Sequence, residues 1–299
     1  MIPAPFRYVL AGTVDDAVEL LGQHGDDARV IAGGQSLLPL MKLRLASPSV
    51  VIDLAGAGLT GIDIDIDIDI DGTTLVIGAM TTYRDVVRSP LVAMHAPLLA
   101  QAASMVGDPQ VRNRGTLGGG VAHADPACDV AGALVALGAS VTIQGPSGTR
   151  SLGIEDFLVG FWTNAMADDE VLVAVRVPSA VGVAWAYEKF AIRAQDWALV
   201  AVAVAGPRVA LLSMGDRIIR AHTTEEAFAG GASAADAAAL ADMGTHPLAD
   251  LRGSSDYRRH LARVLTERAL LASARNTTRN TTRNTTQNTT QNTTQNTTG

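Results

Sequence analysis

Two short glycine-containing segments are the parts of this chain best suited to chemistry: 32–36, Ala-Gly-Gly-Gln-Ser, and 116–120, Thr-Leu-Gly-Gly-Gly. Glycine permits positive φ and has no Cβ, so the main-chain N–H groups beside it can approach phosphate oxygens closely. One such loop is a weak signal. Two of them about eighty residues apart, each followed by its own continuation, predict a single bound dinucleotide.

The pattern of apolar residues predicts the elements that hold the two glycine segments in place. Residues 14–21 have helical spacing behind Thr13 as an N-cap, and 29–31 form a short buried strand that runs into the first segment. Ser36 is expected to cap a helical turn over 37–42. The other expected strands are 50–54, 74–78, 140–144 and 170–177, and the other expected helices are 83–87, 98–105 and 129–137.

The pattern changes after Pro178. Strands are expected at 185–190, 199–205 and 208–214, followed by alanine-rich helices at 234–242 and 257–272. This combination predicts a separate α+β unit, a short antiparallel sheet with helices on it. The expected domains are therefore 1–178, itself split near 55–75 into two α/β subdomains, and 179–275, followed by a tail at 276–299.

Two repetitive segments stand apart from the fold. Residues 63–71 alternate Asp and Ile, which on a strand places the Ile side chains on one face and the Asp side chains on the other. A strand spreads its carboxylates along a line, so a solvated edge is favoured over a calcium site. The tail at 276–299 repeats Asn-Thr-Thr-Arg and then Asn-Thr-Thr-Gln, has no apolar residue to bury and is expected to be disordered.

Composition excludes several classes of protein. The chain has 299 residues, of which 47% are hydrophobic and 18% charged, which is typical of a globular protein large enough for two cores. A net charge of −7 argues against nucleic-acid binding. No apolar run approaches the ~20 residues that span a membrane. The N-terminus has no secretory signal, so a cytoplasmic protein is expected.

Cysteine content limits the metal chemistry. Cys128 is the one cysteine, so the chain cannot form an internal disulfide or supply the four thiolates that iron–sulfur clusters usually need. The six histidines show no metal-ligand spacing. We therefore expect no metal site in this chain, and any metals of a redox system would lie on other polypeptides. Cys128 itself is expected to be a small buried residue.

Three segments resemble the FAD-binding medium subunit of molybdenum hydroxylases, a group that includes carbon monoxide dehydrogenases and xanthine dehydrogenases. They are 32–44, then 108–119 with its continuation 122–129, and finally 187–190 with Arg193 and 196–198. The likeness covers about residues 5–272. It implies an α+β fold, with a two-part FAD-binding domain of the PCMH/vanillyl-alcohol-oxidase type and a smaller domain of antiparallel sheet plus helices that closes over the flavin.

The resemblance implies a non-covalent FAD. Backbone N–H groups of 32–36 and 116–120 would surround the pyrophosphate, helped by two hydroxyls. Asp129 would bond the ribose or adenine side, and Lys189 and Trp197 would lie near the flavin ring. The expected cofactor-binding set is Ala32, Gly33, Gly34, Gln35, Ser36, Leu37, Thr116, Leu117, Gly118, Gly119, Gly120, His123, Asp125, Asp129, Lys189 and Trp197, with no catalytic residue.

Each of these assignments has a plainer alternative. The glycines could serve tight turns only, and Asp129 could cap the helix that follows it. Lys189 could be a surface cation and Trp197 a core aromatic residue. His123 and Asp125 could form a local hydrogen-bonded turn without touching a cofactor.

The resemblance also implies a role. The chain would be the FAD-binding electron-transfer subunit of a heterotrimeric enzyme, most similar to carbon monoxide dehydrogenase. A large subunit would hold the molybdenum cofactor and a small subunit two [2Fe–2S] clusters, in a dimer of heterotrimers, with a quinone or NAD as the external acceptor. Gly120 departs from the family, which often has Asn or Ser there, so a side-chain hydrogen bond is lost.

Other functions stay open from the sequence. One is a xanthine or aldehyde dehydrogenase-type FAD subunit. A second is a stand-alone flavin oxidoreductase of the same fold, and a third is an interaction protein that kept the fold and lost the flavin.

Overall fold

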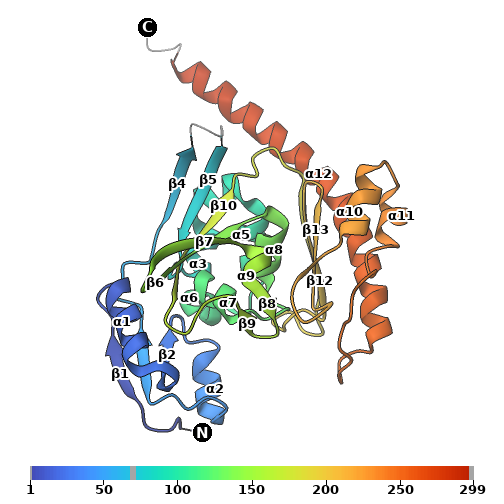
Figure 1. Ribbon diagram of the computed structural model, residues 1–299. Coiled ribbons are helices and arrows are strands. Elements are labelled where there is room, and N and C mark those ends of the chain that lie inside the picture. The colour runs from blue at the N-terminus through green and yellow to red at the C-terminus, as the bar shows by residue number, and fades with distance from the viewer. Residues whose placement is uncertain (1, 68–71, 296–299) are drawn as a thin grey trace.

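Figure 1 shows the computed structural model, which describes the backbone of residues 2–67 and 72–295 and the side chains of residues 2–66 and 72–276. The chain begins with a three-stranded parallel sheet of order β1-β3-β2, on which α1 packs. Its elements are β1 (Arg7–Leu10), α1 (Val14–His24), the 3₁₀ turn η1 (Gly25–Asp27), β2 (Ala28–Ile31), α2 (Leu37–Leu43) and β3 (Val50–Asp53). Thr13 caps α1 as predicted, and forms a reciprocal capping box with Asp16.

A five-stranded antiparallel sheet of order β4-β5-β10-β6-β7 forms the centre of the molecule (Figure 1). Its strands are β4 (Ile62–Asp67), β5 (Gly72–Gly78), β6 (Ser140–Gly145), β7 (Gly148–Gly153) and β10 (Val171–Pro178). The helices beside it are α3 (Tyr83–Arg88), α4 (Pro90–His95), α5 (Pro97–Ser104), α6 (Pro109–Arg114), α7 (Leu117–His123), α8 (Asp129–Leu137) and α9 (Ile154–Phe157). A small hairpin, β8 (Leu158–Gly160) with β9 (Thr163–Asn164), follows α9.

The C-terminal part contains a four-stranded antiparallel sheet of order β11-β12-β13-β14. Its elements are β11 (Trp185–Phe190), β12 (Val200–Ala205), β13 (Arg208–Leu212), β14 (Ile219–Arg220), α10 (His222–Ala229), α11 (Ala234–Ala238) and α12 (Ser255–Gln295). This sheet lies between α8 on one face and α12 on the other (Figure 1). The chain therefore has the mixed helix-and-sheet fold that the sequence predicts, ending in a smaller domain.

Strand β12 explains how the two parts join. Its sequence is Val-Ala-Val-Ala-Val-Ala, and all six residues are buried. Side chains alternate between the faces of a strand, so the valines enter the core beneath α12 and the alanines enter the core shared with α8. Helix α8 is buried along its whole length because it has a sheet on either side. The small alanines let α8 and the C-terminal sheet approach closely.

The two repetitive segments have different outcomes. Ile62–Asp67 forms the edge strand β4, in agreement with the predicted solvated edge, and residues 68–71 of the Asp-Ile run lie outside the described residues. The backbone of 276–295 continues α12, whereas the sequence predicts a disordered tail from 276. A helix already begun propagates with one hydrogen bond per added residue, and 255–275 provide that beginning. Residues 296–299 lie outside the described residues.

Candidate functional site

One cleft of about 750 Å³ brings the predicted segments together. Its walls come from the loop after β2, from the segment around α7, from the residues between β9 and β10, and from the loop before β12. The cleft is therefore shared between the N-terminal subdomain, the central sheet region and the C-terminal domain. Of the predicted site residues, all line the cleft except Leu117, Asp125 and Lys189.

The first glycine segment supplies free backbone donors to this cleft. Gly34 has φ 74°, which favours glycine, and a Cβ on Gly33 would overlap the carbonyl oxygen of Arg114. Within the described part of the chain, the amides of residues 33–37 donate no hydrogen bond. Ser36 occupies the N-cap of α2, but its side chain makes no capping hydrogen bond, contrary to the prediction. Five successive amides at a left-handed turn form the kind of concave site that binds anions.

The second glycine segment differs from the expectation. The amides of Leu117 and Gly118 donate to the carbonyl oxygens of Thr81 and Ala79, each at 2.9 Å. The Gly119 amide donates to the Thr116 hydroxyl, and the Gly120 amide to the Thr116 carbonyl. These N–H groups are therefore used within the protein and are not free donors for a pyrophosphate. The reason is that Thr116 begins α7 as its N-cap, and a capped helix satisfies its own first amides.

Close packing explains the glycines of this second segment. A Cβ on Gly118 would lie 2.5 Å from the Ala79 Cβ, and one on Gly119 would lie 2.7 Å from its own N-cap hydroxyl. A Cβ on Gly120 would overlap the hydroxyl of Tyr83. Gly118 and Gly120 are thus required so that α7 can lie close to Ala79, just after β5, and to Tyr83 at the start of α3. These three glycines lie inside α7, so the tight-turn alternative from the sequence does not describe them either.

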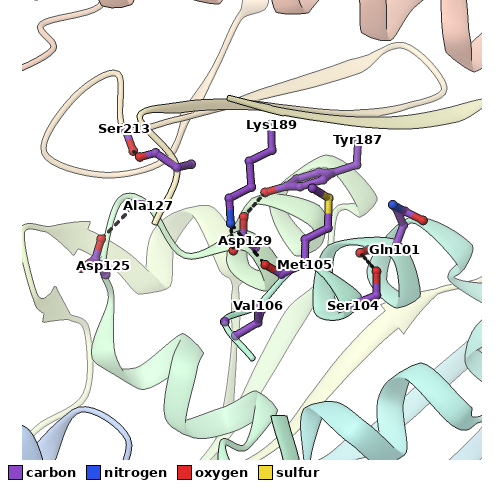
Figure 2. Close-up of polar contacts among 12 residues, drawn as sticks. Gln101, Ser104, Met105, Val106, Asp125, Ala127, Asp129, Tyr187, Lys189 and Ser213 are labelled. Carbon is purple, nitrogen blue, oxygen red and sulfur yellow. Dashed lines mark hydrogen bonds and ion pairs between the residues drawn. The ribbon is translucent and has the colours of Figure 1, made fainter. Parts of the chain in front are cut away.

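Asp129 and Lys189 bond to each other, as Figure 2 shows. The Lys189 Nζ lies 2.9 Å from Asp129 Oδ2 and also donates to the Met105 carbonyl at 3.3 Å. The Tyr187 hydroxyl donates to Asp129 Oδ1 at 2.5 Å. Burial raises the pKa of Asp129 above its ordinary value, while the Lys189 ammonium and the Tyr187 hydroxyl act in the opposite direction. Both carboxylate oxygens thus accept hydrogen bonds from β11 of the C-terminal domain.

This arrangement argues against two of the plainer alternatives. Lys189 is not a surface cation, because its side chain is only 3% exposed, and it lies behind the cleft wall rather than on it. Asp129 is the first residue of α8 and not its cap, which is Cys128. Cys128 is buried as predicted, and burial raises the pKa of its thiol to about 12.

The remaining predicted residues lie at or near the mouth of the cleft. Trp197 is 49% exposed, so it is not a core aromatic residue. His123 lines the cleft, and burial lowers its pKa. Asp125 makes the local turn, accepting from the Ala127 amide at 2.8 Å, and its second oxygen accepts from the Trp162 indole at 3.2 Å.

Sequence reasoning missed three side chains of this region. Tyr83 and Trp162 line the cleft, and Tyr187 holds Asp129. Tyr187 stands two residues before Lys189 on a predicted strand, so their shared face could have been found from the spacing. No local signal marks Trp162, which adopts φ 50° at the tip of the β8–β9 hairpin.

The free backbone N–H groups and the exposed aromatic side chains of the cleft suit a dinucleotide. The free amides at 33–37 suit a pyrophosphate, and exposed Trp197 and Trp162 offer flat apolar surfaces to an aromatic ring. Among residues with described side chains, no group of three or more His, Cys, Asp or Glu could hold a metal ion. None of the described helices is both long and apolar enough to cross a membrane.

Comparison with known proteins agrees with this fit. Residues 4–180 match the family model for the FAD binding domain in molybdopterin dehydrogenase, and residues 185–273 match the CO dehydrogenase flavoprotein C-terminal domain. By fold and site the chain is thus an FAD-binding oxidoreductase subunit. It belongs to the family of FAD-binding medium subunits of molybdenum hydroxylases, which confirms the resemblance found in the sequence.

Individual relatives match along nearly their whole length. The carbon monoxide dehydrogenase medium chain of Hydrogenophaga pseudoflava is 40% identical, over 91% of this chain and 98% of the relative. The nicotine 6-hydroxylase medium subunit of Paenarthrobacter nicotinovorans is 36% identical, over 92% and 99%. The solved carbon monoxide dehydrogenase of Hydrogenophaga pseudoflava that lacks the Mo-pyranopterin moiety superposes with a TM-score of 0.86 at 41% identity, over 91% and 98%.

Proposed function

We propose that this chain is the electron-outlet subunit of a heterotrimeric molybdenum hydroxylase of the carbon monoxide dehydrogenase type. It would stand between a small iron–sulfur subunit and an external acceptor, while a large molybdenum subunit oxidises the substrate. We place this complex, a dimer of heterotrimers, in the cytoplasm. The observation that carries the proposal is the row of free amides at 33–37, in a cleft that the C-terminal domain completes.

The residues of the chain would divide the work of binding. The amides of 33–37 would hold the pyrophosphate, and the unbonded Ser36 hydroxyl lies beside them. Trp197 would cover one face of the flavin ring. Asp129 would offer its carboxylate to the cofactor while Tyr187 and Lys189 hold that carboxylate in place by hydrogen bonds. When bound, FAD supplies redox chemistry that accepts electrons from one-electron carriers and passes them on. The acceptor would approach from the open mouth, where Trp162 and Trp197 are exposed.

The division of cofactors among subunits follows from residue content. With Cys128 as the one cysteine, the chain cannot ligate an iron–sulfur cluster by itself. The match to the CO dehydrogenase flavoprotein C-terminal domain supports the carbon monoxide dehydrogenase type. A nicotine 6-hydroxylase medium subunit is also 36% identical, which is consistent with substrate choice lying on the large subunit.

The test is a visible absorption spectrum of the chain purified alone and together with co-expressed candidate partner subunits. We expect flavin bands, and in the co-purified complex also iron–sulfur absorption and bound molybdenum. Substrate turnover by the isolated flavoprotein would instead favour a stand-alone flavin oxidoreductase. A colourless preparation in both cases, even after addition of FAD, would refute the proposal.

A further inference from the structure

Tyr83 is a buried aromatic residue that the second glycine segment encloses. It is the first residue of α3 and is 6% exposed, yet it lines the cleft. Its amide donates to the Gly115 carbonyl at 2.9 Å, and the preceding Thr82 pairs with Thr116 in an isolated β-bridge. The backbone on both sides of the second segment therefore fixes where the Tyr83 ring lies.

Two glycines leave room for this ring. A Cβ on Gly115 would lie 2.9 Å from the Tyr83 Cε2 atom, closer than real Cβ contacts allow. A Cβ on Gly120 would overlap the hydroxyl oxygen itself, whereas the ring carbon Cζ would be 3.3 Å away. The Tyr83 hydroxyl thus occupies the space that any side chain at position 120 would fill.

The hydroxyl has no hydrogen-bond partner in the described part of the protein. Its neighbours are Gly120, Cys128 and Asp129, all of which line the cleft. Burial raises the pKa of Tyr83 well above its ordinary value, with Cys128 and Asp129 acting in the same direction, so the group stays a protonated donor. The hydroxyl oxygen is not among the fully enclosed unpartnered side-chain atoms, and its residue lines the cleft, so a molecule bound there can accept a hydrogen bond from it.

We propose that the Tyr83 hydroxyl is a direct hydrogen-bonding contact of the bound FAD. This inference rests on the proposed function and extends it by one cofactor-binding residue.

The test uses three variants of the full-length chain: Tyr83→Phe, Gly120→Ser and the double variant. The FAD dissociation constant is measured by flavin fluorescence, in the chain alone and with its partner subunits, and the apo-protein melting temperature is measured in parallel. Tyr257→Phe, on α12 and outside the cleft lining, is the matched control and should bind FAD as the wild type does.

We expect Tyr83→Phe to keep the melting temperature and to weaken FAD binding about three- to tenfold, the size of one neutral hydrogen bond. Gly120→Ser should lower the melting temperature and weaken binding more strongly, because its Cβ must displace the hydroxyl. The double variant should recover part of both quantities, since Phe removes the overlapping hydroxyl but its Cζ still lies a tight 3.3 Å from the new Cβ, and serine supplies a hydroxyl of its own.

Unchanged FAD affinity in Tyr83→Phe, or a double variant as weak as Gly120→Ser, would overturn the inference and leave the proposed function standing. If the wild-type chain binds no FAD with or without its partners, both are overturned. The two failures are therefore distinguishable by the wild-type titration alone.

Discussion

Replacing Lys189 with methionine should destabilise the protein strongly although it removes no apolar contact of the core. The Lys189 and Asp129 side chains are 3% and 5% exposed, and their charged atoms lie 2.9 Å apart. Methionine has a similar length but no charge, so Asp129 would be left buried and without its cation. Removing one partner of a buried ion pair costs about 3–5 kcal/mol, and we expect a loss of that size in the free energy of unfolding.

The assay is urea denaturation of the apo-protein near neutral pH. Lys42→Met is the matched control, because Lys42 is exposed on α2, and it should change stability by less than about 0.5 kcal/mol. The double variant Asp129→Asn with Lys189→Met removes both charges and should recover most of the lost stability. The two single losses should therefore be far from additive.

The pH dependence of Lys189→Met has a definite sign. Burial raises the pKa of Asp129 in the folded protein, and the Lys189 ammonium opposes this rise. Without that cation the folded-state pKa rises further above the unfolded value, so the folded variant binds a proton more readily than the unfolded chain. Its stability should therefore increase as the pH falls through the folded-state pKa and on to the unfolded value, and over that range the gap to the wild type should narrow.

A decrease of less than about 1 kcal/mol in the free energy of unfolding of Lys189→Met would refute this reasoning, because a buried carboxylate without its cation costs more than that. A double variant no more stable than the single one would refute it as well. In that case the lysine would act through its packing or through the Met105 carbonyl rather than through Asp129.

Three further predictions concern other parts of the chain. Gly33→Ala should abolish FAD retention, because the new Cβ would overlap the Arg114 carbonyl oxygen. The control Gly22→Ala in α1 places its Cβ where nothing lies within 4 Å, so it should leave the stability of the protein unchanged or raise it. Flavin content and melting temperature are measured for both variants. Partial burial raises the pKa of Asp250, but hydrogen bonds from two arginines outweigh the burial and lower the pKa to about 2. Asp250→Asn should therefore be less stable than the wild type at neutral pH. In denaturation experiments the two proteins should become equally stable as the pH falls through that pKa. Truncation after residue 276 should leave the melting temperature unchanged, because 277–299 contain no apolar side chain.

Local features of the fold were predictable wherever the signal lay within a few residues. The Thr13 cap, the strand at 29–31 and the alternation of 62–67 follow from side-chain chemistry and periodicity, and the structure contains each of them. The first glycine segment was also predictable, since a left-handed turn at Gly34 is a backbone property of glycine.

The second glycine segment shows where such reasoning stops. Glycine serves an anion loop and a close helix contact equally well, and the sequence does not say which. The carbonyl oxygens of Ala79 and Thr81 accept hydrogen bonds from the amides of Gly118 and Leu117, and this happens because the connection between β5 and α3 lies alongside the segment, with Thr82 bridged to Thr116. The distinction depends on a neighbouring backbone roughly forty residues earlier in the chain.

By itself, then, the sequence determined the family, the dinucleotide chemistry of the cleft and the absence of thiolates for an iron–sulfur cluster, because these depend on residue types and short motifs. Only the tertiary structure decided that Lys189 meets Asp129, sixty positions away, and that the Tyr83 hydroxyl fills the space at Gly120. The physical reason is the same in both cases. Burial makes a charge or a hydroxyl depend on its neighbours in space, and packing of α3, α8 and β11 selects those neighbours.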